Sequence, residues 1–258
     1  MMPAACWSLA FLLAIPSAGA GPECNRVCED QLKDVFGCCP QTPTSTGRVG
    51  ARRSPGVPLV TFQGPSGHPL LAMKQEVSQA LYQAVTGSAP SAHGACGATC
   101  PVERVHWCDA VAFANRLSVR EWLRPAYRIP AGFQPGMDVE ACDRLAPEVT
   151  WDPTANGWRL PTQAEWEALA VLEDVPADLP ARQARSRPAC GGLEDRQGIC
   201  DAVGNVWEWT WDADSEGLRG VRGCSFACAP GTAGVGSSQR CAPGVRDEGI
   251  GFRLVRAP

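Results

Sequence analysis

Two cysteines four residues apart have the residue type and spacing for metal or redox chemistry. Cys224 and Cys228 stand in the stretch RGCSFACAPGTAG, and the loop after them consists almost entirely of small residues. Two thiolates can bind a soft ion such as copper(I), whereas paired cysteines in an oxidising compartment more often form disulfides. The alternatives are a reactive thiolate, a disulfide, or two separate structural sulfurs, and we favour a disulfide at Cys228.

The segment DAVGNVWEWTWD is a second candidate for chemistry. Asp201 and Glu208 place carboxylates at its two ends, and a turn at Gly204 and Asn205 would aim backbone carbonyls between them. Because calcium prefers carboxylate and carbonyl oxygens, we expect a structural calcium site here. The alternative is that Glu208 pairs with an arginine. The three tryptophans of the segment alternate along a strand and are expected to be core residues.

Histidine and charge content argue against several other kinds of chemistry. The chain has only His68, His93 and His106, which are scattered, and Ser225 has no histidine motif near it. We therefore expect no nucleophilic hydrolase. His106 stands where a helix should begin, so a capping or surface role is expected for it. The net charge of −4 comes without a basic stripe, so nucleic acid is not an expected partner.

Three helices are expected to position these residues. They fall within residues 76–87, 105–123 and 158–170. Ser78 caps the first helix and Gly87 ends it, while Thr162 and Glu165 form a capping box at the start of the third. The middle helix has apolar side chains at three- and four-residue spacing, namely Trp107, Val111, Ala114 and Leu117.

Short strands are expected at residues 58–64, 205–211, 220–226 and 251–256. Two to three helices, short twisted strands and much irregular structure predict an α+β fold.

The N-terminal residues read as export and linker segments. Residues 1–20 form an apolar stretch that ends in Ala18-Gly19-Ala20, as a signal peptide does, so we expect a secreted or periplasmic protein that does not span a membrane. Residues 21–57 contain four cysteines followed by a Pro-, Ser- and Arg-rich linker. Two internal bridges are the favoured interpretation of these cysteines, and a zinc site is the alternative. The main domain is then expected over residues 58–258.

Cysteine count adds one further expectation. Fourteen cysteines, one of them inside the signal peptide, leave 13 in the mature chain. An odd number leaves one sulfur free or paired with another chain, so a covalent dimer is one alternative. From spacing, we expect bridges within three pairs: Cys96 with Cys100, Cys190 with Cys200, and Cys108 with Cys142.

Six motifs in this order resemble the formylglycine-generating enzyme family, also called sulfatase-modifying factors. They are EVSQALYQAVTG, CPVERVHWCDAVAFANRLS, WRLPTQAEWEALA, DAVGNVWEWTWD, RGCSF and GFRLVR. The resemblance covers about Pro58 to Arg256 and implies an elaborated C-type-lectin-like fold. Its best-known members oxidise a sulfatase cysteine to formylglycine with copper(I) and O₂, and many others carry the fold without known catalysis.

The resemblance also assigns metal ligands. It implies calcium ligands in the side chains of Asp201 and Glu208 and the backbone oxygens of Gly204 and Val206. It places the first active cysteine of the oxidases at Cys228, but the second position holds Ala233, which has no donor atom. Copper is therefore not an expected cofactor.

Two further implications follow from the same resemblance. Cys241 aligns with a family cysteine whose usual partner position is Ala170 here, so Cys241 needs another partner, with Cys228 or Cys224 as the near candidates. The expected partner of Cys228 is therefore Cys241 or Cys224, and a bridge from Cys228 to Cys241 would close a loop of about 13 residues. The iron-dependent relatives need a histidine-rich site that this chain does not have, so iron chemistry is not expected.

Two functions remain. The favoured one is a non-catalytic binding or structural module with a calcium site, whose ligand is a protein, peptide or glycan. The alternative is a copper-dependent oxidase of a sulfatase cysteine that uses Cys228 with a substitute ligand.

Overall fold

The computed structural model describes residues 57–170, 185–192, 194–228 and 237–258. In these ranges the chain forms four α-helices: α1 (Gln79–Thr86), α2 (Trp107–Arg120), α3 (Val139–Leu145) and α4 (Gln163–Leu169). Two short 3-10 helices, η3 (Gly94–Cys96) and η4 (Ala146–Glu148), accompany them. The predicted signal peptide and nearly all of the cysteine-rich segment lie outside the described residues and stay predictions.

Helix ends follow the local sequence signals. The Ser78 side chain accepts a hydrogen bond from the Leu81 N–H, and Gly87 ends α1 with a left-handed φ of 78°. At the start of α4, Thr162 and Glu165 form the predicted capping box. Helix α3 was not expected, although Asp138 caps it. Four helices thus replace the two to three expected, and the α+β fold class is confirmed.

Strands form three small sheets within the described ranges. The first has the order β1-β2-β9, with β1 (Leu59–Gln63), β2 (Pro69–Met73) and β9 (Val255–Arg256). The second pairs β3 (Tyr127–Arg128) with β4 (Thr150–Trp151). The third has the order β7-β6-β5-β8, with β5 (Trp207–Ala213), β6 (Arg219–Arg222), β7 (Ser238–Cys241) and β8 (Ile250–Gly251).

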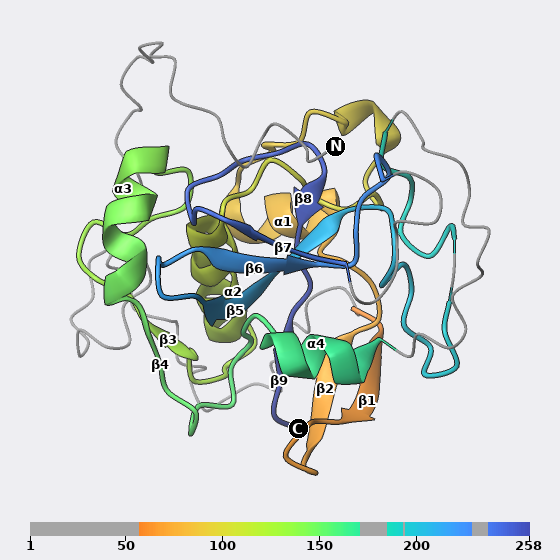
Figure 1. The fold of residues 1–258 in the computed structure, drawn as a ribbon, viewed down its shortest axis with the longest axis horizontal. Helices are drawn as coiled ribbons and strands as arrows, with labels where there is room; N and C mark the ends of the chain where they lie inside the picture. Colours follow the sequence, from red (N-terminus) through yellow and green to blue (C-terminus); the bar gives the residue numbers. More distant parts are fainter. Residues whose placement is uncertain (1–56, 171–184, 193, 229–236) are drawn as a thin grey trace, which may run out of the picture.

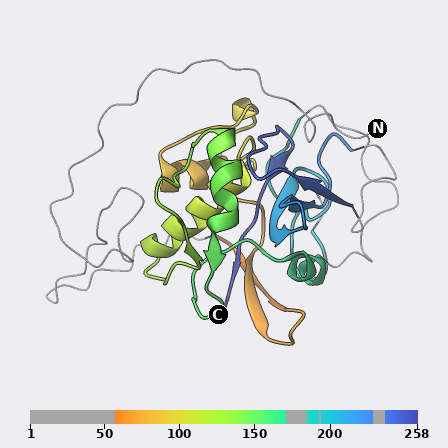
Figure 2. The ribbon, with the colours of Figure 1, turned by 60° about the vertical axis from the view of Figure 1, so that its left-hand side comes forward.

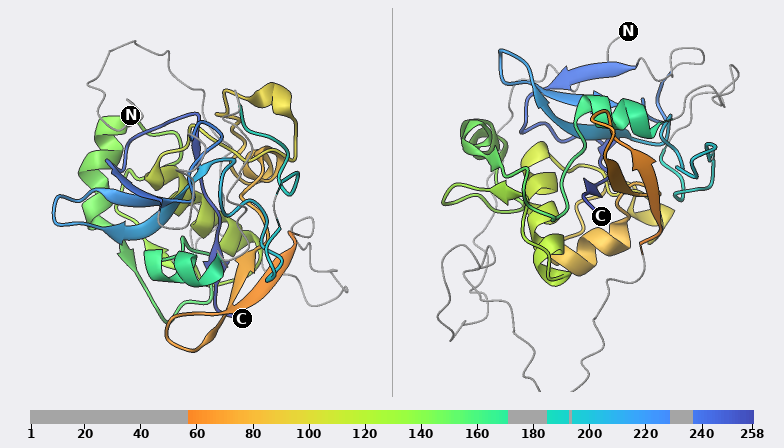
Figure 3. Two further views of the ribbon diagram at one scale, coloured as in Figure 1. Left: turned by 45° about the vertical axis from the view of Figure 1, so that its right-hand side comes forward. Right: turned by 90° about the horizontal axis from the view of Figure 1, so that it is seen from below.

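The four-stranded sheet has the helices α1, α2 and α3 near it, and α4 with the β1–β2 hairpin lies below it (Figure 1). Figure 2 shows α1, α2 and α3 on one side of it, with α4 below it and next to the β1–β2 hairpin. The two views of Figure 3 agree that α4 lies against β5, β6 and the hairpin. The candidate carboxylate Glu208 lies on β5 beside α4, whose Trp166 contacts it.

Helix α2 is the most deeply buried of the four helices. All four apolar residues picked out by their spacing are fully buried: Trp107, Val111, Ala114 and Leu117. Its N-cap is His106, whose Nδ1 accepts from the Asp109 N–H at 2.9 Å, so the predicted capping role is confirmed. Burial lowers the pKa of His106. No helix among the described residues is long and apolar enough to cross a membrane.

The segment 250–256 connects the sheets. β8 pairs in parallel with β5, and four residues later β9 pairs with β2. Between these strands, the Phe252 carbonyl accepts from the Val77 N–H and the Leu254 carbonyl accepts from the Met73 N–H, both at 2.9 Å. Arg253 lies in the middle of this segment and is completely buried, so it points a charge into the interior.

Candidate functional site

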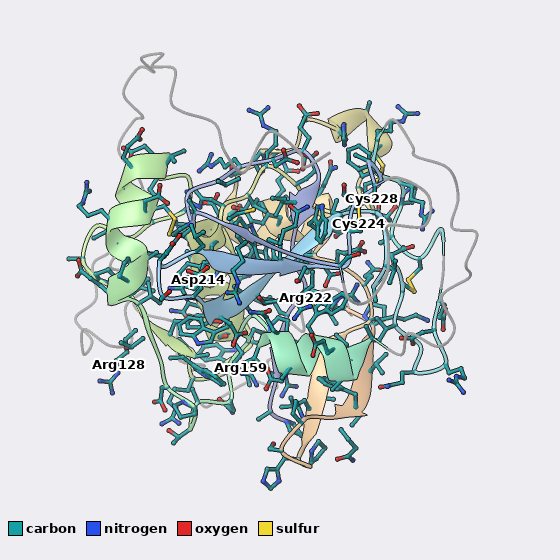
Figure 4. All side chains as sticks on the ribbon, in the orientation of Figure 1. Arg128, Arg159, Asp214, Arg222, Cys224 and Cys228 are labelled. Carbon is teal, nitrogen blue, oxygen red and sulfur yellow. A yellow bond between two sulfur atoms is a disulfide. The ribbon has the colours of Figure 1, made fainter. Side chains whose placement is uncertain are left out.

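A sharp turn after β6 places the two cysteines of the first motif. Gly223 and Cys224 both have left-handed backbones, with φ of 95° and 69°. A side chain at Gly223 would clash with the Ala202 carbonyl oxygen, so only glycine fits there. The turn brings Cys224 and Cys228 to a Cα separation of 6.1 Å, and the two form a disulfide (Figure 4).

The predicted disulfide at Cys228 is confirmed, with Cys224 as its partner, whereas the expectation that Cys241 pairs with Cys228 or Cys224 is wrong. Cys241 ends β7, where it faces Arg219 at the start of β6, while Ser238 faces Arg222 at the end of β6. Antiparallel pairing therefore puts Cys241 at the far end of β6 from the cysteine turn. Cys241 is disulfide-bonded as well, but not to Cys228.

Three other predicted bridges are confirmed: Cys96–Cys100, Cys108–Cys142 and Cys190–Cys200. His106, Cys108 and Cys142 lie close enough together to form a possible group of metal ligands. Both sulfurs are bonded to each other and His106 caps α2, so this group does not offer thiolates to a metal. All four bridges described here join cysteines of the same chain.

The acidic residues of the second motif lie in the interior with cationic partners. Asp201 is buried; its Oδ1 accepts from the Arg187 guanidinium and its Oδ2 from the Cys190 N–H, both at 2.7 Å. Gly204 and Asn205 have left-handed φ values of 93° and 54°, so the chain does turn where the sequence predicts it.

Glu208 on β5 is completely buried and pairs with Arg253. The guanidinium donates from Nε to Oε2 at 2.8 Å and from one terminal nitrogen to Oε1 at 2.6 Å. The indole of Trp166 on α4 also donates to Oε2, at 2.8 Å. Burial lowers the pKa of Arg253, but Glu208 beside it more than offsets this, so the net shift of the Arg253 pKa is upward.

Asn205 connects the acidic segment to the cysteine turn. Its amide donates to Glu76 Oε1 at 3.0 Å, and its backbone carbonyl accepts from the Phe226 N–H at 2.9 Å. Glu76 is buried, and its second oxygen, Oε2, has no hydrogen-bond partner. Burial, with a smaller contribution from the charge of Asp201, raises the pKa of Glu76 to about 8.

These contacts bear on whether calcium fits. Each of the four carboxylate oxygens of Asp201 and Glu208 accepts a hydrogen bond from a nitrogen, and each carboxylate has an arginine as its counter-ion. Calcium needs such oxygens as direct ligands, so the two side chains do not fit the ion in this arrangement. The set of Asp201, Gly204, Val206 and Glu208 stays a prediction, and the alternative in which Glu208 pairs with an arginine describes the observed geometry.

The model of the sulfatase-modifying factor enzyme 1-like domain matches residues 58–172 and 176–258. The chain belongs to the sulfatase-modifying factor family. A curated relative, the chaperone protein LppX of Paenibacillus barcinonensis, is 41% identical over 97 residues, which is 38% of this chain. That match spans about a third, 34%, of the relative's length.

Two solved structures have a similar fold. Treponema denticola variable protein 1 superposes with a TM-score of 0.64 at 26% identity, over 79% of this chain and 93% of that one. The structure of CarF gives a TM-score of 0.59 at 26% identity, over 79% of this chain and 94% of the other. The resemblance aligns Cys228 of this sulfatase-modifying factor domain with the first active cysteine of the oxidases. The Cys228 sulfur is bonded to that of Cys224.

Sequence reasoning did not identify three residues of this region. Arg187, Arg253 and Glu76 supply the partners and neighbours of the predicted carboxylates. For Arg253 a signal exists, because GFRLVR puts a charge inside an apolar run. Residues 229–236, which include Ala233, lie outside the described residues.

Proposed function

We propose that the protein is an exported, disulfide-stapled binding module of the sulfatase-modifying factor family that does not carry out copper-dependent oxidation. The observation that carries this proposal is the Cys224–Cys228 disulfide. A sulfur in a disulfide is not a thiolate and cannot bind copper(I). The alanine at position 233 removes the second donor of the family pair as well.

Export is part of the proposal. The four described bridges are typical of proteins that fold outside the reducing cytosol. The apolar residues 1–20 supply the matching signal. The calcium site implied by the resemblance is not part of this proposal, because Arg187 and Arg253 already pair with its two carboxylates, and its test follows in the Discussion.

A protein is the partner class that we favour. The curated relative, which matches over 97 residues, is named a chaperone protein. The fold alone does not determine the activity of a protein, so the name supports a partner class and not a reaction. On the surface, Trp122 is 56% exposed and the largest exposed apolar side chain of the described residues. Trp122 follows the C-cap of α2 and has a left-handed φ of 61°, at a position where glycine is usual after a helix. Exposed tryptophans are frequent anchors of protein interfaces, so we place the contact there.

The copper part of the proposal is tested with a cysteine-containing sulfatase peptide, copper(I) and O₂. The wild-type protein should give no aldehyde product and should take up no copper at Cys228. A matched variant, Cys224→Gly with Ala233→Cys, restores the family pair and serves as the positive control for copper uptake. Turnover by the wild type would overturn the proposal.

The partner surface is tested by photo-crosslinking in the exporting host. A crosslinker at position 120, next to Trp122, should yield discrete protein adducts that disappear with Trp122→Ala. Leu59→Ala, which removes another exposed apolar side chain, is the matched control and should keep them. Adducts that persist in Trp122→Ala would contradict the placement.

A further inference from the structure

The sulfur atoms of the cysteine turn have a different electrostatic environment from those of the other described bridges. Cys228 Sγ accepts a hydrogen bond from the Ser225 N–H at 3.2 Å. The turn holds this donor in place, because the Cys228 N–H donates to the Ser225 carbonyl at 3.1 Å and the Ala227 N–H donates to the Ser225 hydroxyl at 3.2 Å. A backbone N–H thus points at the sulfur that would become a thiolate when the bridge opens.

In the other three bridges, oxygen atoms face the sulfurs. Cys96 Sγ lies 3.4 Å from the Ser186 carbonyl oxygen, and Cys108 Sγ lies 3.6 Å from the Cys142 carbonyl oxygen. In the third bridge the neighbours are side-chain oxygens: Gln75 Oε1 lies 3.6 Å from Cys190 Sγ, and Glu194 Oε2 lies 4.0 Å from Cys200 Sγ.

The atoms next to each sulfur affect the stability of the thiolate that forms when the bridge is reduced. An N–H donor stabilises a negative sulfur, and hydrogen bonds to charged groups are stronger than those to neutral ones. Carbonyl and carboxylate oxygens repel the same charge. Stabilising the reduced form makes a disulfide a stronger oxidant. The Cys224–Cys228 bridge should therefore be the most readily reduced of the four described bridges.

Access to the bridge is asymmetric. Cys224 is buried, with 3% of its surface exposed, whereas Cys228 is partly exposed. An incoming thiolate therefore reaches the Cys228 sulfur first. The N–H donor of Ser225 faces this same sulfur.

We propose that Cys224 and Cys228 form a redox-active pair that exchanges with the thiols of a partner protein. A partner thiolate attacks Cys228 Sγ, a bond forms between these two sulfurs, and the Cys224–Cys228 bond breaks as Cys224 leaves and takes up a proton. The second partner thiol loses its proton and attacks the partner sulfur of the mixed disulfide, and Cys228 leaves as the thiolate that the Ser225 N–H stabilises. The partner dithiol loses two electrons to become a disulfide, and the bridge gains them.

The proposal rests on the proposed function only in that Cys228 holds no copper. The first experiment equilibrates the wild-type protein in a series of reduced and oxidised glutathione buffers, followed by alkylation and mass spectrometry. Cys96–Cys100 is the matched control, since it closes a loop of the same four-residue separation. We expect the Cys224–Cys228 equilibrium to favour reduction at least about tenfold more, a difference of about 30 mV. Equal or later reduction of Cys224–Cys228 would overturn the proposal.

Two variants test the attacking sulfur. Cys224→Ser leaves Cys228 alone, and Cys100→Ser leaves Cys96 alone. With oxidised glutathione at neutral pH, Cys228 should form its mixed disulfide about ten times faster than Cys96. Equal rates would contradict the role of the Ser225 N–H, and the wild-type titration decides the question if either variant does not fold.

A synthetic dithiol peptide measures the whole step. For each wild-type protein molecule, the Cys224–Cys228 bridge should produce one peptide disulfide. A variant with both Cys224→Ser and Cys228→Ser lacks this bridge and should not produce that disulfide. A failure here leaves the copper experiment unaffected, because one assay reads the thiol state of the protein and the other reads an aldehyde on a peptide.

Discussion

Arg253 and Glu208 form a two-point ion pair in which neither side chain is exposed to solvent. The pair joins the segment between β8 and β9 to β5, and Trp166 extends it to α4. Arg253 also donates to the backbone carbonyls of Lys74 and Cys200, at 3.0 and 2.8 Å. One buried arginine therefore ties four parts of the chain together.

Removing one partner of this pair should strongly destabilise the fold. Glu208→Gln leaves the Arg253 charge in the interior without a counter-ion, so we expect a loss of about 3–5 kcal/mol in the free energy of unfolding. Urea titration measures it. Arg240→Gln removes a partly exposed ion pair to Asp214 and should cost less than about 1 kcal/mol. A Glu208→Gln variant as stable as this control would contradict the prediction.

Calcium should have little effect on the wild-type protein. Because Arg187 and Arg253 already neutralise Asp201 and Glu208, an ion must displace an arginine to bind. We expect the same thermal midpoint with excess chelator and with millimolar calcium. Arg187→Ala frees Asp201 and should produce a calcium-dependent rise, while Arg240→Ala should not. A rise in the wild type would support the four-ligand site implied by the resemblance.

Glu76 should make stability decrease as pH rises. Its pKa is about 8 in the folded protein, raised from an ordinary value of 4.5. The folded state therefore holds a proton that the unfolded chain releases between these values, and stability falls from about pH 4.5 until it levels off near pH 8. The slope is at most about 1.4 kcal/mol per pH unit. Chemical denaturation of the wild type and Glu76→Gln at several pH values tests this, and equal slopes would contradict it.

Two disulfides should differ in their contribution to stability. In the chain-entropy description, Cys108–Cys142, with a sequence separation of 34, should contribute about 4 kcal/mol, and Cys224–Cys228, with a separation of 4, about 2 kcal/mol. Paired serine substitutions and urea titration give the two values. A larger loss at Cys224–Cys228 would mean that the cysteine turn supports the fold more than its loop length implies.

Local signals in the sequence predicted the elements that local interactions define. Ser78, Thr162 and Glu165 mark helix starts because their side chains bond to backbone groups within three residues. Helix α3 was missed because seven residues are too short to show a helical period, and it lacks the capping box that marks the equally short α4. The tryptophans of β5 were predicted as core residues, and Trp209 is fully buried.

Partners distant in the sequence were the part that could not be predicted. The Glu208 partner is 45 residues away, and Arg187 approaches Asp201 through a turn that the sequence does not specify. Cys241 seemed near Cys228 by number, but the register of β6 against β7 separates them. Choosing among such partners requires the tertiary arrangement of strands, which residue spacing does not contain.

The position of residues 250–256 has a consequence for how the chain acquires its structure during synthesis. β8 and β9 complete two separate sheets, and Phe252, Arg253 and Leu254 fill the space between them. Until these residues have been synthesised, the earlier sheets and α4 lack a common centre. Stable packing of the first and third sheets against each other should therefore form only after this segment has left the ribosome.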